Sequence, residues 1–164
     1  MPELPEVETV RRGLADLLPG QAVVRATVFD SPKSFPNSPI DVQQFLYGAH
    51  VTAVRRRAKV LMIDLDTRYS LVIHLKMTGQ LIFRGANSFA GGHPNDSLIG
   101  ELPDKSTRVQ IDFTDGSHLF FNDQRKFGWM KLMPTDEIEN LPFMQKVGPE
   151  PLDKKTKAGD FIKR

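Results

Sequence analysis

Two-residue alternation of apolar and polar side chains runs through several short segments of this 164-residue chain. The pattern is clear in Leu71–Lys76 and again in Arg108–Phe113, and it places one set of side chains on each face of a strand. Asp115-Gly116 lies between two such segments and is a strong signal for a tight hairpin turn. Short strands joined by tight turns predict a mainly β chain, built as an antiparallel sandwich or a flattened barrel.

The same pattern gives bounds for the individual strands. Glycine, proline and asparagine are concentrated between Ala86 and Ser106, which predicts an exposed, mobile loop there. The expected strands are Val23–Phe29, Val51–Arg57, Val60–Asp66, Leu71–Lys76, Val109–Thr114, His118–Asn122 and Phe127–Met133.

An apolar stripe at helical spacing lies near the start of the chain. Pro5–Leu18 is expected to form a helix, because proline suits the first helical position and Pro19-Gly20 ends it. A shorter helix is expected at Val42–Leu46. The longer helix places its positive N-terminal end beside the first residues of the chain. Its apolar stripe consists of Val7, Val10, Leu14, Leu17 and Leu18.

Composition narrows the class of protein. With 40% hydrophobic and 26% charged residues, the chain is typical of a globular domain. No apolar run approaches the roughly 20 residues that cross a bilayer, and charges interrupt the N-terminal segment where a signal peptide would be apolar. The lack of cysteine excludes disulfides and any cysteine-ligated zinc site within the chain.

A net charge of +2 conceals local clusters of basic residues. Arg55–Lys59 is the densest, Arg125-Lys126 is a second, and a third lies in 154–164. Basic clusters on a near-neutral body indicate a surface that faces phosphate groups, and a solvated charged face is the alternative.

The first residues carry the strongest chemical signal. Removal of Met1 would leave Pro2 as an N-terminal secondary amine with Glu3 beside it. An amine nucleophile next to a proton donor is a general arrangement for covalent catalysis, and a secondary amine forms an iminium ion with a sugar carbon. If Met1 is retained, the nitrogen is part of an amide and this chemistry is lost. The alternative is that a Met-Pro start has no function.

Five motifs together resemble one family, the formamidopyrimidine-DNA glycosylases of bacterial base-excision repair. They occur in the order and at the spacing of that family, and the resemblance covers essentially the whole chain. The first motif is similar to the oxidised-purine branch of the family and differs from the endonuclease VIII branch. The motifs are Pro2–Leu14, Arg56–Lys59, His74–Gly79, Asp123–Gly128 and Gly148–Leu152.

The resemblance implies a fold and a domain organisation. The first domain of the family is a β-sandwich flanked by helices, and the second carries a helix–two-turn–helix motif and usually a four-cysteine zinc finger. We therefore expect residues 1–147 to form the N-terminal catalytic domain. Residues 148–164 are expected to be the interdomain linker and the start of a second domain that this chain lacks. No cofactor is expected in this chain, because the zinc finger belongs to the second domain.

The resemblance also implies catalytic roles. Pro2 matches the nucleophile, Glu3 matches the general acid that protonates the opening sugar, and Glu6 matches a supporting acidic position. Lys59 matches the active-site lysine, which contacts a phosphate near the lesion. The alternatives are carboxylates that favour the helix dipole for the two glutamates, and a solvated turn residue for the lysine.

Further positions match residues that bind the DNA. Met77, Arg125 and Phe127 match the three residues that fill the gap when the damaged nucleotide is flipped out. His74 matches a phosphate contact. Arg108 follows a segment where the family is commonly rich in histidine, and it is expected to hold a phosphate instead. The alternatives are core packing for the two apolar residues and a satisfied sheet residue for the histidine.

The function implied by the resemblance is excision of oxidised purines, namely formamidopyrimidines and 8-oxoguanine. Excision is followed by β- and δ-elimination at the abasic site through a proline iminium. The isolated domain is expected to be weakly active. Its expected partner is double-stranded DNA that holds an oxidised purine or an abasic site, and no membrane association is expected. The expected location is the bacterial cytoplasm, at the nucleoid. The residues favour no particular oligomeric state. The alternative is a non-catalytic DNA-binding or scaffold module that lacks half of the DNA clamp.

Overall fold

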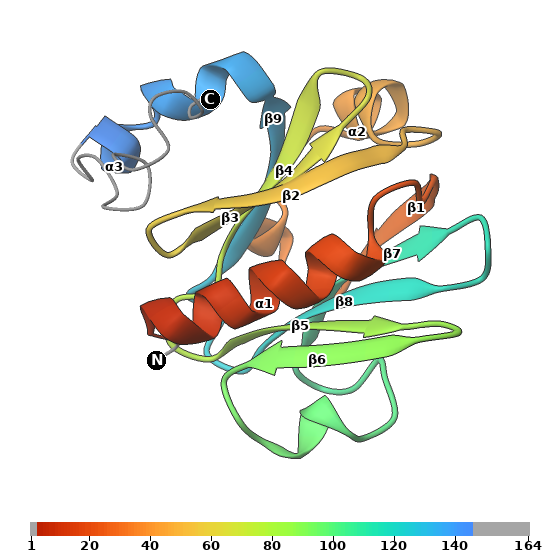
Figure 1. The fold of residues 1–164 in the computed structure, drawn as a ribbon, viewed down its shortest axis with the longest axis vertical. Helices are drawn as coiled ribbons and strands as arrows, with labels where there is room; N and C mark the ends of the chain where they lie inside the picture. The colour runs from red at the N-terminus through yellow and green to blue at the C-terminus, as the bar shows by residue number, and fades with distance from the viewer. Residues whose placement is uncertain (1–2, 146–164) are drawn as a thin grey trace.

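The computed structural model describes residues 3–145, and within them two antiparallel sheets face each other (Figure 1). One sheet has the strand order β1-β7-β8-β5-β6, and the other has the order β2-β3-β4-β9. The described strands do not close into a barrel, so the sandwich prediction is confirmed and the flattened-barrel alternative is wrong. The strands are β1 Val23–Val28, β2 Val51–Arg57, β3 Val60–Leu65, β4 Tyr69–His74, β5 Gly79–Arg84, β6 Ser88–Gly92, β7 Thr107–Phe113, β8 His118–Asp123 and β9 Trp129–Pro134.

Apolar side chains from both sheets fill the space between them. The alternation predicted for β4 and β7 is confirmed, because the apolar set of each strand lies in this main core. Each large side chain removed from water stabilises the fold by about 1.5–3 kcal/mol. The core-facing residues of these two strands include Leu71, Ile73, Val109, Ile111 and Phe113.

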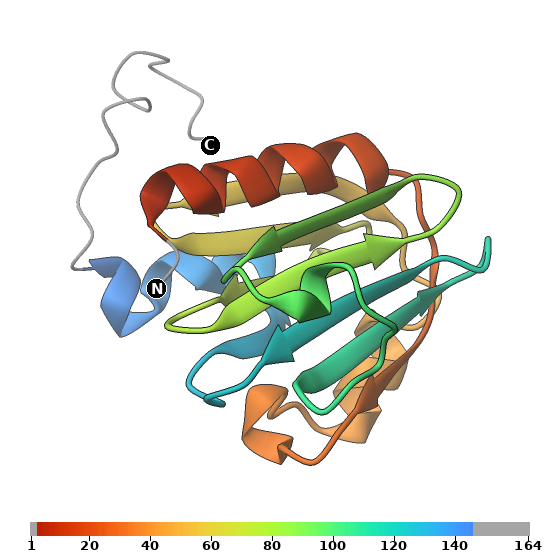
Figure 2. The same cartoon turned by 90° about the horizontal axis from the view of Figure 1, so that it is seen from below.

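Helix α1 (Leu4–Leu17) covers one open side of the sandwich, where β2 and β6 are the edge strands (Figures 1 and 2). Its predicted apolar stripe is confirmed, since Val7, Val10 and Leu14 are buried in the main core. Gly91 in β6 permits this close approach, because a Cβ there would lie 2.7 Å from Cγ2 of Val10. Packing against both sheets fixes the position of the helix N-terminus.

The opposite side, where β1 and β9 are the edge strands, is covered by helix α2 (Pro39–Phe45) and the 3-10 turn η1 (Pro32–Ser34). The side-chain amide of Asn37 donates to the carbonyl oxygen of Leu132 at 2.7 Å and accepts from its N–H at 2.8 Å. The amide thus replaces a neighbouring strand at this position, which protects the edge of β9 from pairing with another chain.

A second apolar cluster lies on the outer face of the four-stranded sheet. The 3-10 helix η3 (Thr135–Asn140) and helix α3 (Pro142–Gln145) contribute residues that cover it. As a result β3 and β4 are buried on both faces, which simple alternation does not predict. The cluster consists of Val60, Met62, Val72, Met133, Ile138 and Met144.

The prediction of a loop between residues 86 and 106 is wrong in part, because this segment contains β6 and the 3-10 turn η2 (Asp96–Leu98). Glycines in β6 resemble a turn signal, yet Gly91 allows close packing against α1. The alternation pattern also misses β5, since five of its six residues are buried and no polar face marks it.

Some expectations fall outside the part of the chain that the structure describes. These are the nucleophile Pro2 and the predicted linker and second-domain start at 148–164. Among residues 3–145, no helix has the length and apolar character needed to cross a membrane.

Candidate active site and neighbouring loops

The predicted acidic residues lie at the N-terminus of α1. Glu3 is the N-cap, and its backbone N–H donates to Oε1 of Glu6 at 2.5 Å. This bond satisfies a main-chain donor at the start of the helix and gives Glu6 a capping role. The Glu3 side chain is 66% exposed, so its carboxylate is open to solvent. Pro2, one residue earlier, is outside the described residues.

Lys59 comes to the same place from the turn between β2 and β3. Its Nζ lies 3.5 Å from Oε1 of Glu3, so two predicted residues 56 positions apart meet at the helix N-terminus. The lysine side chain is 32% exposed. An exposed ion pair of this kind adds little to folding stability, and it leaves both groups accessible to a ligand.

Glu8 holds α1 and the β2–β3 hairpin together. Its carboxylate accepts N–H groups from Arg11 at 3.0 and 2.9 Å, from Arg12 at 2.9 Å and from Arg56 at 2.7 Å. Partial burial raises the pKa of Glu8, but the bonds from these guanidinium groups outweigh it and lower the pKa to about 2. Arg56 also donates to the carbonyl oxygen of Ala58 at 3.2 Å, directly before Lys59.

The three consecutive arginines of the basic run each pair with a carboxylate. Arg55 donates from Nε to Asp64 at 2.6 Å, and Arg57 pairs with Glu139. Arg56 pairs with the helix carboxylate described above. The run therefore fastens β2 to its neighbours, and a structural role accounts for three of the cations that the sequence marks as a phosphate-facing cluster.

His74 ends β4, opposite Val60 on β3 and Trp129 on β9. Burial, and then the nearby charges of Lys76 and Lys59, together lower the pKa of His74 to about 4. Its Nδ1 accepts the backbone N–H of Lys76 at 3.1 Å. The ring is therefore neutral at pH 7 with its proton on Nε2, which leaves one N–H donor for an acceptor such as a phosphate oxygen.

The three predicted gap-filling residues lie on two turns. Met77 is 38% exposed and Phe127 is 52% exposed, so neither is packed into the core. The guanidinium of Arg125 lies over the Phe127 ring, 5.1 Å from its centre, in a cation–π arrangement. Large apolar side chains that are exposed to solvent at the tips of turns are typical of a binding surface.

Arg108 is a buried cation, with only 5% of the residue exposed. Its Nε donates to the carbonyl oxygen of Asp123 at 2.9 Å, and no carboxylate among residues 3–145 forms an ion pair with it. A buried charge without a counter-ion is costly, so this position favours an anionic ligand.

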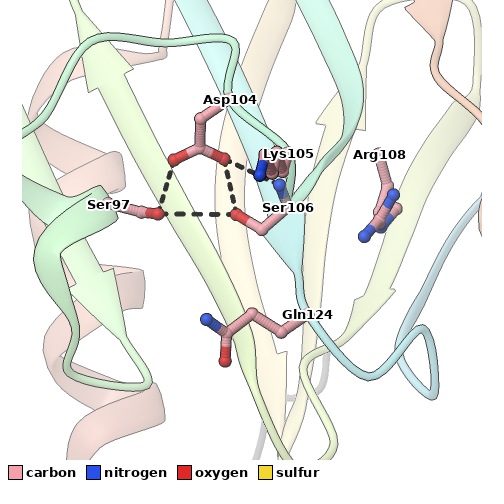
Figure 3. Close-up of a pocket in the computed structure, with 6 residues that line it drawn as sticks. All are labelled: Ser97, Asp104, Lys105, Ser106, Arg108 and Gln124. Atoms are coloured by element: carbon pink, nitrogen blue, oxygen red, sulfur yellow. Dashed lines mark hydrogen bonds between the residues drawn. The ribbon is translucent and has the colours of Figure 1, made fainter.

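Arg108 borders an open polar pocket with a volume of about 370 Å³ (Figure 3). Ser97, Asp104 and Ser106 are hydrogen-bonded to one another in this pocket, and Arg108 stands apart from them. Lys105 also lines it, so the pocket has a second cation. Partial burial raises the pKa of Asp104, and hydrogen bonds, first from Ser97 and Ser106, outweigh it and lower the pKa.

Sequence reasoning missed two residues of this region, Glu8 and Asp123. Both stand inside the motifs, but the sequence indicates only a helix-dipole role for the first and no role for the second. Their importance comes from partners distant in sequence, such as Arg56 and Thr78. In the described part of the chain, no three His, Asp or Glu side chains gather as a metal site.

Comparison with known proteins identifies the class to which this sandwich and helix N-terminus belong. The family model described as "Formamidopyrimidine-DNA glycosylase N-terminal domain" matches residues 1–130. The chain belongs to this family.

Relatives and solved structures agree with that membership. Formamidopyrimidine-DNA glycosylases of Jannaschia sp. and Dinoroseobacter shibae are 43% and 39% identical to the chain, over 93% of its length and 52% of theirs. The protein from Caulobacter sp. is 40% identical over 98% of the chain and 57% of its own length. The chain thus spans about half the length of these relatives.

Two crystal structures of the Lactococcus lactis protein have the same fold. A complex with DNA that contains N7-benzyl-Fapy-dG superposes with a TM-score of 0.74 at 28% identity, and covers 94% of this chain and 53% of that one. A complex bound non-covalently to DNA with an abasic site has a TM-score of 0.73 at 29% identity, over 93% and 55% of the two chains.

Proposed function

We propose that this chain is the catalytic half of a DNA glycosylase and abasic-site lyase that acts on oxidised purines. The observation that carries the proposal is the meeting of Glu3 and Lys59 at the N-terminus of α1, directly after Pro2 in sequence. An acid and a cation that meet one residue after the expected amine nucleophile support this proposal.

The proposed reaction follows from the resemblance and from these groups. With Met1 removed, the neutral amine of Pro2 attacks the anomeric carbon of the damaged nucleotide and displaces the base, and the proton that the nitrogen loses neutralises the departing base. Glu3 protonates the sugar ring oxygen as the ring opens, which gives an iminium ion. Loss of a proton from the adjacent sugar carbon then expels the 3′ phosphate, and a second elimination expels the 5′ phosphate. Lys59 holds a phosphate throughout this sequence.

Two further groups support binding of a DNA backbone. The neutral His74 has an N–H donor available at Nε2, and Arg108 has a buried guanidinium without a carboxylate partner at the polar pocket. We assign both to phosphate groups, which take neutral and charged N–H donors alike. This role gives Arg108 the counter-ion that the described protein groups do not supply.

The exposed Met77 and Phe127 would replace the stacking that a flipped nucleotide leaves behind, and Arg125 would hydrogen-bond the orphaned base. Exposure of both apolar side chains supports this assignment over core packing. A repair role of this kind places the protein in the bacterial cytoplasm, at the nucleoid.

Cleavage products distinguish the enzyme from a module that only binds DNA. Duplexes with 8-oxoguanine or with a preformed abasic site are incubated with protein whose first residue is verified as Pro2 by mass. We expect slow strand cleavage that leaves phosphates on both sides of the gap, faster on the abasic duplex. Binding that weakens with salt but gives no cleavage of either duplex would favour the non-catalytic module.

A further inference from the structure

The turns that carry Met77 and Phe127 share an unusual backbone feature. Lys76 has a φ of 54° and Lys126 has a φ of 60°, so a non-glycine residue in the left-handed region immediately precedes each exposed apolar residue. Such residues are strained and persist only where the surrounding structure holds them. Each of the two turns therefore needs support from the surrounding structure.

Asp123 supplies that support from the end of β8. The residue is completely buried. One carboxylate oxygen, Oδ1, accepts the hydroxyl of Thr78, the residue after Met77. The other, Oδ2, accepts the backbone N–H of Gly128, the residue after Phe127, at 2.6 Å. A single carboxylate thus binds the residue next to each exposed apolar side chain.

Two more contacts complete the connection between the turns. The backbone N–H of Arg125 donates to Oγ1 of Thr78 at 3.0 Å, and it lies 3.3 Å from Oδ1 of Asp123. Gly128 is pressed against the end of β4, since a Cβ there would lie 2.7 Å from the carbonyl oxygen of His74. The three groups that donate to Asp123 are the Thr78 hydroxyl and the backbone N–H groups of Arg125 and Gly128, so the carboxylate contacts both turns.

We propose that Asp123 is a positioning residue that joins the two turns into one preformed wedge, with Thr78 as the link between them. The wedge is the unit formed by Met77, Arg125 and Phe127. This inference rests on the proposed function, in which the wedge enters the duplex. Preforming the wedge lowers the ordering cost of insertion, because the turns already have their bound conformation in the free protein.

Thr78→Val tests the link, because valine keeps the shape of threonine and removes its hydroxyl. Asp123→Asn is the more direct change, but it places an amide donor among three donors in the core and endangers folding. Thr78→Ser keeps the hydroxyl and should restore wild-type behaviour. Thr52→Val is the matched control, because Thr52 is an exposed threonine on β2 whose hydroxyl also donates a hydrogen bond.

Wedge insertion is measured by the fluorescence of 2-aminopurine placed next to an abasic-site analogue in a duplex. We expect Thr78→Val to need about three- to tenfold more protein for the half-maximal signal, which corresponds to the loss of one hydrogen bond. Thr78→Ser and Thr52→Val should match wild type. The yield of borohydride trapping on single-stranded abasic DNA should be equal in all four proteins, because single-stranded DNA has no base-pair gap for the wedge to fill.

A measurement without DNA keeps the inference separate from the proposed function. In NMR spectra of the free protein, Thr78→Val should shift the Met77 methyl signal and speed hydrogen exchange at the Arg125 amide. Thr78→Ser should do neither. If wild type neither traps DNA nor gives a fluorescence signal, the proposed function fails and these spectra alone decide the role of Asp123. Unchanged spectra in Thr78→Val, or equal changes in Thr78→Ser, would overturn the inference.

Discussion

At the scale of single residues, the environment of each side chain decides which chemistry it can perform. Lys59 and Arg55 belong to the same basic run, but Arg55 is tied to Asp64 whereas Lys59 faces the exposed carboxylate of Glu3. The sequence predicts Lys59 as a site residue only through the family resemblance. A run of charges does not reveal which of its cations already has a structural partner. The same limit applies to Glu8, whose three guanidinium partners lie on α1 and β2.

Replacement of Lys59 tests its assignment to a phosphate. We expect Lys59→Met to lower the rate of abasic-site cleavage by about ten- to a hundredfold, the range for one charge-assisted contact. Folding stability should change little, since the Glu3–Lys59 pair is exposed. Lys131→Met, at an exposed lysine on β9, is the control and should retain full activity. Equal losses in the two variants would argue against a specific contact.

The lowered pKa of His74 should make the free energy of unfolding depend on pH. Its pKa is about 4 in the folded protein and 6.5 as an ordinary value, so the unfolded chain binds the proton more readily between these limits. The free energy of unfolding should therefore fall as pH decreases from 6.5 to 4, and His74→Gln should remove this part of the fall. Urea unfolding at pH 7 and pH 4.5 measures this decrease in the free energy of unfolding. The control His93→Gln should show the same decrease as wild type. A decrease in His74→Gln as large as in wild type would contradict the role given to His74.

At the scale of elements, local patterns gave most of the fold. The sequence pattern predicts the N-terminal helix at Pro5–Leu18, and α1 spans Leu4–Leu17. The predicted bounds of β2, Val51–Arg57, are those of the structure. Errors occurred where tertiary packing overrides the local signal. β6 contains a glycine pair that predicts a loop, and Gly91 is required there by the close approach of Val10.

The Glu8 network should control how α1 is held on β2. We expect Glu8→Gln to lower the free energy of unfolding at pH 7 by roughly 2–3 kcal/mol, because a pKa of about 2 reflects strong preference for the charged form. This contribution is present above pH 4.5 and is lost as pH falls toward 2, so the two proteins should converge in acid. Urea unfolding across this pH range measures the difference.

The control for that experiment is Asp16→Asn, which removes an exposed carboxylate from the same helix. Its free energy of unfolding should stay close to that of wild type at every pH. A Glu8→Gln protein as stable as wild type at pH 7 would show that the helix is held by apolar packing alone.

At the scale of the whole molecule, the sandwich brings separate motifs together. The helix N-terminus, the β2–β3 turn, the end of β4 and the turn after β8 are distant in sequence, and packing of α1 across both sheets gathers the first two. The period-two pattern could predict the sheets but not their pairing across the core. It also could not reveal Asp123, because a buried carboxylate that joins two turns has no local signature.

The most direct test of this account is borohydride trapping on abasic-site DNA, with the N-terminus of the protein verified by mass. We expect a covalent protein–DNA adduct from protein that begins at Pro2, and none from protein that retains Met1 or from Pro2→Gly. No adduct from a folded chain that begins at Pro2, or an undiminished adduct from Pro2→Gly, would contradict the proposal that Pro2 is the nucleophile of this chain.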